Sequence, residues 1–316
     1  MQQTSLKDRR AFLHAAAAAF LGSLGMARRS VAAQPRASDQ STVITLRERV
    51  SLLTSGGTNV VALSTTDGLV LVDSGDPALS DPLIAALQRL SGADGVRTVF
   101  NTHWHLENTG ANERLHRAGA TIVAHENTRL WMSTPTLMPA EDRYRAPRPK
   151  LALPDDTFRV DRSMTVGPER IECAYLIEAH TSGDISVFFR DSNVLAVGDV
   201  ASPVRDPELD YLTGAWIGGR VDAMDRLLAL SNADTIIVPG FGPAITRAAL
   251  QIERDVMKTI YDRTVDLARQ GLGADDMLKA GGMDGLARTW KDPKKFLYDV
   301  QKGLWAHHNK LAPNVV

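Results

Sequence analysis

The chain has 316 residues, of which 44% are hydrophobic and 23% are charged. This is the composition of an ordinary globular protein, and it excludes a disordered, collagen-like or disulfide-built chain. The 36 basic and 37 acidic residues leave no basic excess of the kind that nucleic-acid binding requires. A single cysteine, Cys173, excludes an intramolecular disulfide.

The first 33 residues differ in charge from the rest of the chain. They hold five of the 36 basic residues and one of the 37 acidic residues, which leaves 31 basic and 36 acidic residues and a formal charge of −5 for the remainder. Arg9 and Arg10, followed by Phe12 and Leu13, an apolar run and small residues at 31–33, are typical of a twin-arginine export signal. An amphipathic N-terminal helix is the alternative.

We therefore expect residues 1–33 to be a signal peptide and residues 34–41 to be a linker. The apolar run is short for a membrane span, so the mature protein is expected to reach the periplasm or the exterior without one. The twin-arginine export machinery is then a partner of the chain. Because that machinery carries folded proteins, a metal ion could be inserted before export.

The first half of the mature chain alternates strand and helix patterns. A turn signal at Thr65-Thr66-Asp67-Gly68 joins two apolar runs into a hairpin. Strands are predicted at residues 43–53, 59–64, 69–73, 96–101 and 120–124. Apolar residues at helical spacing predict helices at residues 80–90 and 112–118.

A proline-rich region at residues 135–154 interrupts this alternation. Its basic cluster, Arg143, Arg145, Arg148 and Lys150, is either part of a solvated connector or an anion-binding rim of an active site. Afterwards, strands are predicted at residues 158–160, 164–166, 170–176, 185–189, 194–196 and 235–238. A helix is predicted at 221–231, and 248–309 is almost entirely helical in pattern. Two strand-rich blocks with outer helices indicate a layered α/β sandwich.

Polar or glycine-rich loops follow several of these strands. His103 and His105 follow the strand 96–101, and imidazoles at positions i and i+2 can converge on one zinc ion. Glu107 adds a carboxylate to the same loop. The other loops carry Asp73, His180, Asp199 and the segment Pro239-Gly240-Phe241-Gly242. Sites in α/β proteins gather at the carboxyl ends of strands, so we expect these residues to lie close together.

In their order and spacing, these motifs resemble the metallo-β-lactamase fold superfamily. That family has a His-x-His-x-Asp-His loop, a distant histidine, a Gly-Asp and a Pro-Gly-His-Gly. The resemblance implies a four-layer αββα sandwich over residues 42–247, followed by a helical C-terminal extension over residues 248–316. It also implies that His103, His105 and His180 hold one metal ion, and that Asp199 matches the aspartate that bridges two ions.

The second metal site of the family is not preserved. Glu107, Asn108 and Phe241 stand where the family has an aspartate and two histidines. A phenylalanine cannot bind a metal ion, and an amide oxygen is a weaker zinc ligand than imidazole. We therefore predict one Zn²⁺, held by the three histidines, rather than two. Restoring histidine at positions 108 and 241 is expected to raise the metal count.

These residues suggest an exported metal-dependent hydrolase, in which a metal-bound hydroxide attacks the ester, lactone, thioester or amide carbonyl of a small molecule. Asp199 would bind the metal or accept a hydrogen bond from its water. Glu107 would act as a general base or orient a histidine. Asn108 would donate to an oxyanion or cap the next helix.

The alternative function is that of a catalytically degenerate family member that binds a ligand or a partner. A serine hydrolase is not expected, because the chain has no Gly-x-Ser-x-Gly motif. Nucleic acid is not an expected partner either. Residues 211–220 are a candidate for one wall of the pocket. The helices after residue 248 could cover the pocket or support a homodimer, and the sequence does not choose between these roles.

Overall fold

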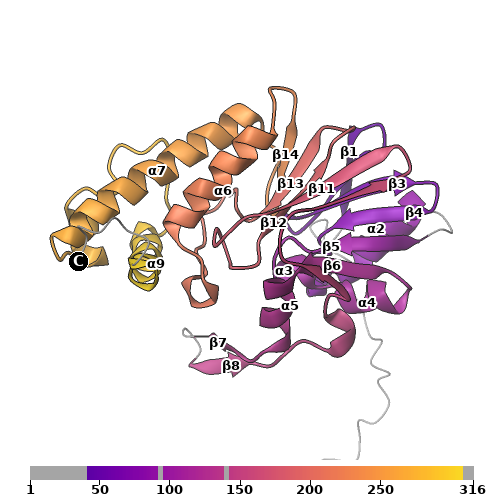
Figure 1. The fold of residues 1–316 in the computed structure, drawn as a ribbon, viewed down its shortest axis with the longest axis horizontal. Coiled ribbons are helices and arrows are strands. Elements are labelled where there is room, and N and C mark those ends of the chain that lie inside the picture. The colour runs from indigo at the N-terminus through magenta and orange to yellow at the C-terminus, as the bar shows by residue number, and fades with distance from the viewer. Residues whose placement is uncertain (1–40, 92–94, 139–141, 309–316) are drawn as a thin grey trace, which may run out of the picture. The chain divides into compact units, whose positions relative to one another are not determined.

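The computed structural model describes residues 41–91, 95–138 and 142–308, and the predicted signal peptide and nearly all of the linker lie outside them. Two β-sheets face each other, and helices cover the outer side of each sheet (Figure 1). The predicted αββα sandwich with C-terminal helices is therefore confirmed.

The first sheet has seven strands. Its first four strands form an antiparallel meander, and its last four strands, of which β4 is shared, run parallel. The predicted hairpin is confirmed as the β3–β4 pair. The predicted strand 43–53 is instead two antiparallel strands, because the chain turns at residues 48–49. In spatial order the strands are β1 (Thr42–Arg47), β2 (Val50–Ser55), β3 (Thr58–Thr65), β4 (Gly68–Val72), β5 (Val96–Phe100), β6 (Thr121–His125) and β9 (Asp156–Phe158).

Helices after β4, β5 and β6 cover the outer face of this sheet or its edge. Leu83 and Leu87 of one helix pack against Leu69, Leu71 and other strand residues in a buried apolar cluster. The last helix of this group begins after His125, as the sequence predicts, and His125 caps it by accepting a hydrogen bond from the Asn127 amide at 3.2 Å. The helices are α2 (Ser80–Ser91), α3 (Leu106–Thr109), α4 (Asn112–Arg117) and α5 (Glu126–Ser133), with a 3-10 turn, η2 (Pro77–Leu79), before α2.

The second sheet has five strands. The first four pair antiparallel, and β14 runs parallel to β13. Two long helices, α6 (Ile217–Leu230) and α7 (Arg247–Arg269), lie along its outer face (Figure 1). The helix α6 begins four residues earlier than predicted. The strands are β10 (Arg162–Val166), β11 (Glu169–Tyr175), β12 (Ile185–Phe189), β13 (Val194–Gly198) and β14 (Ile236–Pro239).

The space between the two sheets is filled by apolar side chains from both. Val61, Val72 and Phe100 of the first sheet meet Val187 and Phe189 of the second in one buried cluster. Each large apolar side chain buried in this way contributes roughly 1.5–3 kcal/mol relative to an exposed one. This core holds the two sheets against each other, and loops from both sheets meet at one edge of the sandwich.

The proline-rich region is not structureless. It contains a two-stranded hairpin, β7 (Thr136–Met138) and β8 (Arg143–Arg145), followed by a 3-10 turn, η4 (Lys150–Ala152). A further 3-10 turn, η5 (Tyr211–Thr213), precedes α6.

After α7 the chain is less helical than its pattern suggests. It forms α8 (Ala274–Lys279) and α9 (Pro293–Ala306), while residues 281–292 are turns and loop. Val300 and Leu304 of α9 join the same apolar cluster as α6 and α7. His307 stacks on Trp216 with ring centroids 5.1 Å apart. The C-terminal helices are therefore packed firmly against the second sheet and its covering helices.

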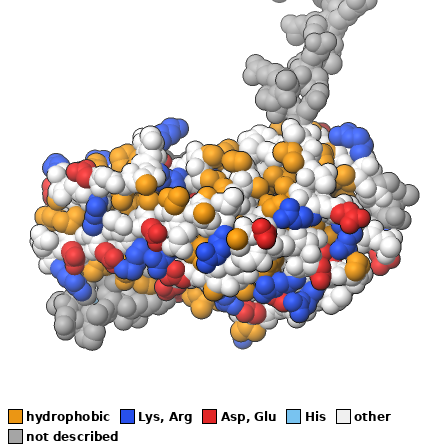
Figure 2. Space-filling model, turned by 90° about the horizontal axis from the view of Figure 1, so that it is seen from above, with side chains coloured by type: hydrophobic (Ala, Val, Ile, Leu, Met, Phe, Trp, Pro, Cys, Tyr) orange, Lys and Arg blue, Asp and Glu red, His pale blue; other side chains and the backbone are white. Residues whose placement is uncertain are grey.

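Among the described residues, none of the helices combines the length and the apolar character needed to cross a bilayer. On the face drawn in Figure 2, basic, acidic and hydrophobic side chains are interspersed. This face therefore has no continuous basic stripe of the kind that follows a nucleic-acid backbone.

Candidate metal centre

The loop after β5 is held in place by a buried carboxylate, Asp73, which follows β4. Its two oxygens accept hydrogen bonds from the Thr102 amide at 2.7 Å and the Thr102 hydroxyl at 2.8 Å. Asp73 has a φ of 63°, a left-handed conformation that non-glycine residues adopt rarely. Burial raises the pKa of Asp73 to about 7 despite these hydrogen bonds. Asp73, at the end of β4, thus fixes Thr102 in the loop after the neighbouring strand β5. This contact positions His103, which follows Thr102 in the chain.

Three buried histidines meet at this edge of the sandwich. His103 and His105 come from the loop after β5, and His180 comes from the loop between β11 and β12. One ring nitrogen from each lies within 4.8 Å of the others. His180 Nε2 and His105 Nδ1 are 3.0 Å apart. The sequence-predicted metal ligands are therefore brought together.

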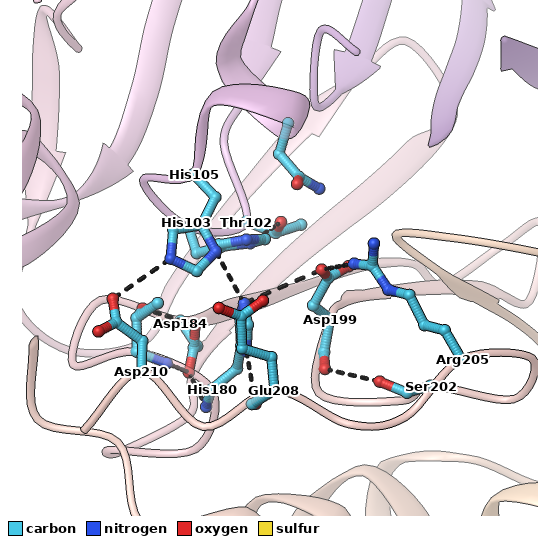
Figure 3. Close-up of polar contacts among 12 residues, drawn as sticks. Thr102, His103, His105, His180, Asp184, Asp199, Ser202, Arg205, Glu208 and Asp210 are labelled. Carbon is cyan, nitrogen blue, oxygen red and sulfur yellow. Dashed lines mark hydrogen bonds and ion pairs between the residues drawn. The ribbon is translucent and has the colours of Figure 1, made fainter. Parts of the chain in front are cut away.

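The outward ring nitrogen of each histidine has its own partner (Figure 3). His103 Nδ1 lies 3.0 Å from the Thr102 hydroxyl. His105 Nε2 lies 3.2 Å from a carboxylate oxygen of Asp210. His180 Nδ1 lies 2.9 Å from the backbone carbonyl of Glu208. Such contacts fix the tautomer and the orientation of a metal-binding imidazole.

The inward nitrogens are suited to a divalent ion. His103 Nε2 is buried and has no hydrogen-bond partner among the described residues. A buried ring nitrogen without a partner is costly unless something occupies the position that it faces. Three imidazole nitrogens are also a donor set that Zn²⁺ commonly takes, with one position left open. The residues present therefore fit the ion that the family resemblance implies.

The electrostatics of the cluster differ between His103 and His105. Burial, together with the positive charges of His180, His105 and Arg205, lowers the pKa of His103 well below its ordinary value. Burial acts to lower the pKa of His105 as well, but the hydrogen bond and charge of Asp210 outweigh it and raise that pKa to about 9. A metal ion that binds His105 Nδ1 would have to displace a proton from that ring.

The other half of the site is built around Asp199, which follows β13. Its carboxylate is buried and lies between the histidines and Arg205 (Figure 3): Oδ2 is 3.9 Å from His180 Nε2 and in contact with an Arg205 guanidinium nitrogen. Gly240 passes close by, because a Cβ placed on it would lie 2.1 Å from Asp199 Oδ1. Only glycine allows this approach. The next residue, Phe241, has the Arg205 guanidinium over its ring, 4.7 Å from the centroid.

Glu107 and Asn108 both lie on α3, beside the histidines. Asn108 is not a helix cap, since its amide nitrogen donates instead to Asp73 at 3.0 Å. Its amide oxygen is buried and unpartnered among the described residues. Asp210 and Thr102 hold the outward nitrogens of His105 and His103, while the charge of Glu107 acts on His105 and helps to raise its pKa.

A cavity of about 440 Å³ opens beside His105 and Glu107. Apolar and aromatic residues form much of its wall. Arg145 of the basic cluster also reaches it, with its guanidinium 5.7 Å from the Trp104 ring centroid, so this part of the cluster borders the site. One wall comes from η5 and another from α9, so the C-terminal extension lines part of the pocket. Its apolar and aromatic wall includes Trp104, Leu137, Tyr211, Leu212 and Tyr298.

Sequence reasoning identified Asp199 but missed the rest of its loop, residues 200–210. The segment around Arg205, Glu208 and Asp210 matches no recognisable motif. In the sequence, only their charges set these residues apart from their neighbours. Buried Arg220 of α6 organises this loop, since it donates to the Asp199 carbonyl at 2.9 Å and to the Glu208 carbonyl at 3.1 Å. The available signal was an arginine directly before the predicted helix 221–231, in a segment of apolar residues and glycines, because an arginine is buried only when it is paired.

Comparisons with known proteins agree with this geometry. The sequence profile of the metallo-beta-lactamase superfamily matches residues 53–240. A metallo-beta-lactamase type 2 from Bacillus cereus is 25% identical over 201 residues, covering 63% of this chain and 73% of that protein. The 2,4-dinitroanisole O-demethylase subunit alpha of Nocardioides sp. (strain JS1661) is 23% identical over 260 residues, covering 80% of this chain and 70% of that protein.

Solved structures give the same result for the fold. A metallo-beta-lactamase from Pontibacter korlensis superposes with a TM-score of 0.57 at 22% identity, covering 69% of this chain and 99% of that one. The profile match includes the loop with His103 and His105, His180, Asp199 and the end of β14. Fold, motif order and the three-histidine cluster thus point the same way, and the chain belongs to the metallo-beta-lactamase superfamily.

Proposed function

We propose that the chain is a metal-dependent hydrolase with a single divalent ion held by His103 Nε2, His105 Nδ1 and His180 Nε2. The observation that carries this proposal is the convergence of three buried ring nitrogens, each with its opposite nitrogen held by a fixed partner. Members of the superfamily are metal-dependent hydrolases, which supports the same class of activity here. When bound, Zn²⁺ supplies Lewis acidity and lowers the pKa of a coordinated water toward about 7.

Glu107 is the residue that we assign to proton transfer. It lines the cavity beside His105, is only partly buried, and makes no hydrogen bond or ion pair with the described part of the chain. A carboxylate that is free of partners and faces the substrate cavity can accept a proton from the attacking nucleophile. Asp199 is less available for this role, because Arg205 holds its carboxylate.

Asn108 is the candidate that would stabilise negative charge on the substrate. One amide hydrogen of its Nδ2 is engaged by Asp73, and the other remains to be donated. A rigid donor near the reacting carbonyl stabilises the oxyanion that forms during acyl transfer. The contact with Asp73 would keep this donor in a fixed orientation.

The cavity favours substrates with an apolar or aromatic part. Trp104, Tyr211 and Tyr298 supply flat aromatic surface, and Leu137 and Leu212 add aliphatic surface. Such walls bind apolar groups by burial, while a few polar groups orient the substrate. We therefore propose that the substrate is a small ester, lactone, thioester or amide with an apolar or aromatic acyl group.

The test combines metal content with turnover. We expect purified protein to hold one zinc ion per chain by mass spectrometry and to hydrolyse some members of a panel of nitrophenyl esters, lactones and nitrocefin. Glu107→Gln should lower kcat by roughly 10²–10⁴-fold with the metal content unchanged. Glu113→Gln is the matched control, since Glu113 pairs with Arg117 on the exposed side of α4. Bound metal without any turnover would favour the degenerate, ligand-binding alternative, and no metal at all would refute the proposal.

We also propose that residues 1–33 direct export by the twin-arginine route. The paired Arg9 and Arg10, the apolar run and the small residues at 31–33 support this proposal. Fused to a fluorescent protein that must fold before export, residues 1–33 should deliver fluorescence to the periplasm. Replacing both arginines by lysine should retain the fluorescence in the cytoplasm. Periplasmic fluorescence that survives this change would exclude the twin-arginine route.

A further inference from the structure

The place beside Asp199 where the family resemblance puts a second ion is already enclosed by protein groups. The position of a Cβ on Gly240 is 2.1 Å from Asp199 Oδ1 and 3.1 Å from Asn108 Nδ2, so these two side chains and Gly240 lie around one point. Phe241 follows directly. Arg205 contacts Asp199 and lies over the Phe241 ring. The Asp199 side chain is 4% exposed and that of Arg205 36% exposed.

A buried carboxylate such as Asp199 requires a positive charge next to it, because an isolated ionised group is very costly to bury. A metal ion can supply that charge, and so can a guanidinium group. Arginine is suited to the task, because its pKa lies above about 12 and its planar group both binds carboxylates and stacks on aromatic rings. A phenylalanine at position 241 provides such a ring, whereas a histidine there would provide a metal ligand.

The backbone of Arg205 is also held in place. Arg288, from the loop between α8 and α9, donates to the Ser202 carbonyl at 2.7 Å and contacts the Arg205 carbonyl. Arg288 in turn lies 3.7 Å from the buried carboxylate of Glu253 on α7, and that carboxylate accepts a hydrogen bond from the Ser202 amide at 2.8 Å. The C-terminal extension therefore fixes the loop that carries Arg205.

We infer that the Arg205 guanidinium takes the place of the second metal ion, clamped between the Asp199 carboxylate and the Phe241 ring. This inference rests on the proposed function, since it assumes that the three histidines hold the first ion. It changes one expectation drawn from the sequence. Histidines at positions 108 and 241 would not suffice to recruit a second ion, because Arg205 still neutralises Asp199 and occupies the space.

The test is the number of zinc ions per chain after equilibration with excess zinc and gel filtration. The wild type and Asn108→His/Phe241→His should hold one ion, whereas the same double variant with Arg205→Ala should hold two. The matched control adds Arg254→Ala to the double variant and should stay at one, because Arg254 pairs with Asp225 on the surface between α6 and α7. Two ions in the double variant, or only one in the Arg205 triple variant, would overturn the inference.

A second measurement applies if the triple variant does not fold. In the presence of a chelator, Arg205→Ala alone should have a lower Tm than the wild type, because Asp199 loses its counter-charge. Excess zinc should then raise its Tm by more than it raises that of the wild type. Equal responses in the two proteins would overturn the inference. A wild type without bound zinc would refute the proposed function, while the low Tm of Arg205→Ala in chelator would still report on the Asp199–Arg205 contact.

Discussion

The two halves of the site handle the same problem, the burial of polar groups, in opposite ways. In the histidine half, three ring nitrogens face one another, and His103 Nε2 has no partner among the described residues. In the aspartate half, the Asp199 carboxylate is neutralised by Arg205, which is part of the chain. The histidine half is therefore suited to a cation from outside the chain, whereas the aspartate half pairs with a cationic group of the chain itself.

This difference teaches that the loss of family ligands is not by itself decay of the site. Phe241 and Asn108 replace two nitrogen ligands, yet each makes a defined contact. Phe241 supports the Arg205 guanidinium, and Asn108 donates to Asp73. A site that had merely degenerated would be expected to leave the Asp199 carboxylate without a counter-charge.

The largest expected effect follows removal of a histidine. In His180→Ala, one of the three converging nitrogens is lost, and we expect the zinc content to fall from one ion per chain to none, together with all activity. His308→Ala is the control, because His308 is exposed at the end of α9 and should leave the zinc content unchanged. Retention of a full zinc equivalent in His180→Ala would mean that the ion is bound elsewhere, and the contrast between the two halves would then fail.

The next effect concerns the loop that serves both halves. Arg220 holds the carbonyls of Asp199 and Glu208, and its side chain is fully buried. Arg220→Met removes these hydrogen bonds and a charge 3.8 Å from Glu253. We expect the free energy of unfolding in urea to fall by about 3–5 kcal/mol, as for other broken buried pairs.

The control for this variant is Arg226→Met, on the same helix. Arg226 pairs with Asp161 near the surface and should contribute less than about 1 kcal/mol. Because His180 Nδ1 also bonds to the Glu208 carbonyl, Arg220→Met should weaken zinc binding as well. Equal urea stabilities of the two variants would show that Arg220 does not support the loop.

Particular residues show where prediction from the sequence succeeded. The predicted site residues lie in loops at the ends of strands with a regular hydrophobic pattern, so the sheet topology determines their position. Motif order and spacing were therefore enough to predict that these residues lie close together: His103, His105, His180 and Asp199. The hairpin β3–β4 was found in the same way, because its turn residues and flanking apolar runs are local signals.

Other features depend on contacts between distant segments and left no local signal. Asp210 meets His105 across 105 positions of sequence, and Arg288 meets Ser202 across 86. The loop at residues 199–210 has no hydrophobic period, so its charged residues could not be assigned partners. The sequence pattern predicts helix at residues 281–292, where the structure has turns and loop. Apolar residues of this segment pack against neighbouring helices without being helical themselves.

A smaller effect on zinc affinity is expected from a change at Asp210, which holds one histidine of the histidine half. Its carboxylate holds His105 Nε2 and also accepts a hydrogen bond from the Thr213 hydroxyl at 2.6 Å. Asp210→Asn should weaken zinc affinity by about 10–100-fold, as is usual for partners of metal-binding histidines. A competition titration with a chromophoric chelator measures this. Asp206→Asn, in the same loop but bonded to the amides of Lys291 and Asp292, should leave the affinity unchanged.

The smallest effect is expected at Cys173, the remaining residue type that could bind zinc. Cys173 lies between the two sheets, and burial raises the pKa of its thiol to about 12. At pH 8 only about one thiol in ten thousand would be ionised, against about a quarter in an unfolded chain, and the thiolate is the reactive form. Native protein should therefore resist iodoacetamide both with and without a chelator, and unfolded protein should react. Cys173→Ala should keep one zinc ion. Rapid labelling after chelation would show that the Cys173 sulfur had bound the zinc ion. The three histidines would then not be the complete set of protein ligands.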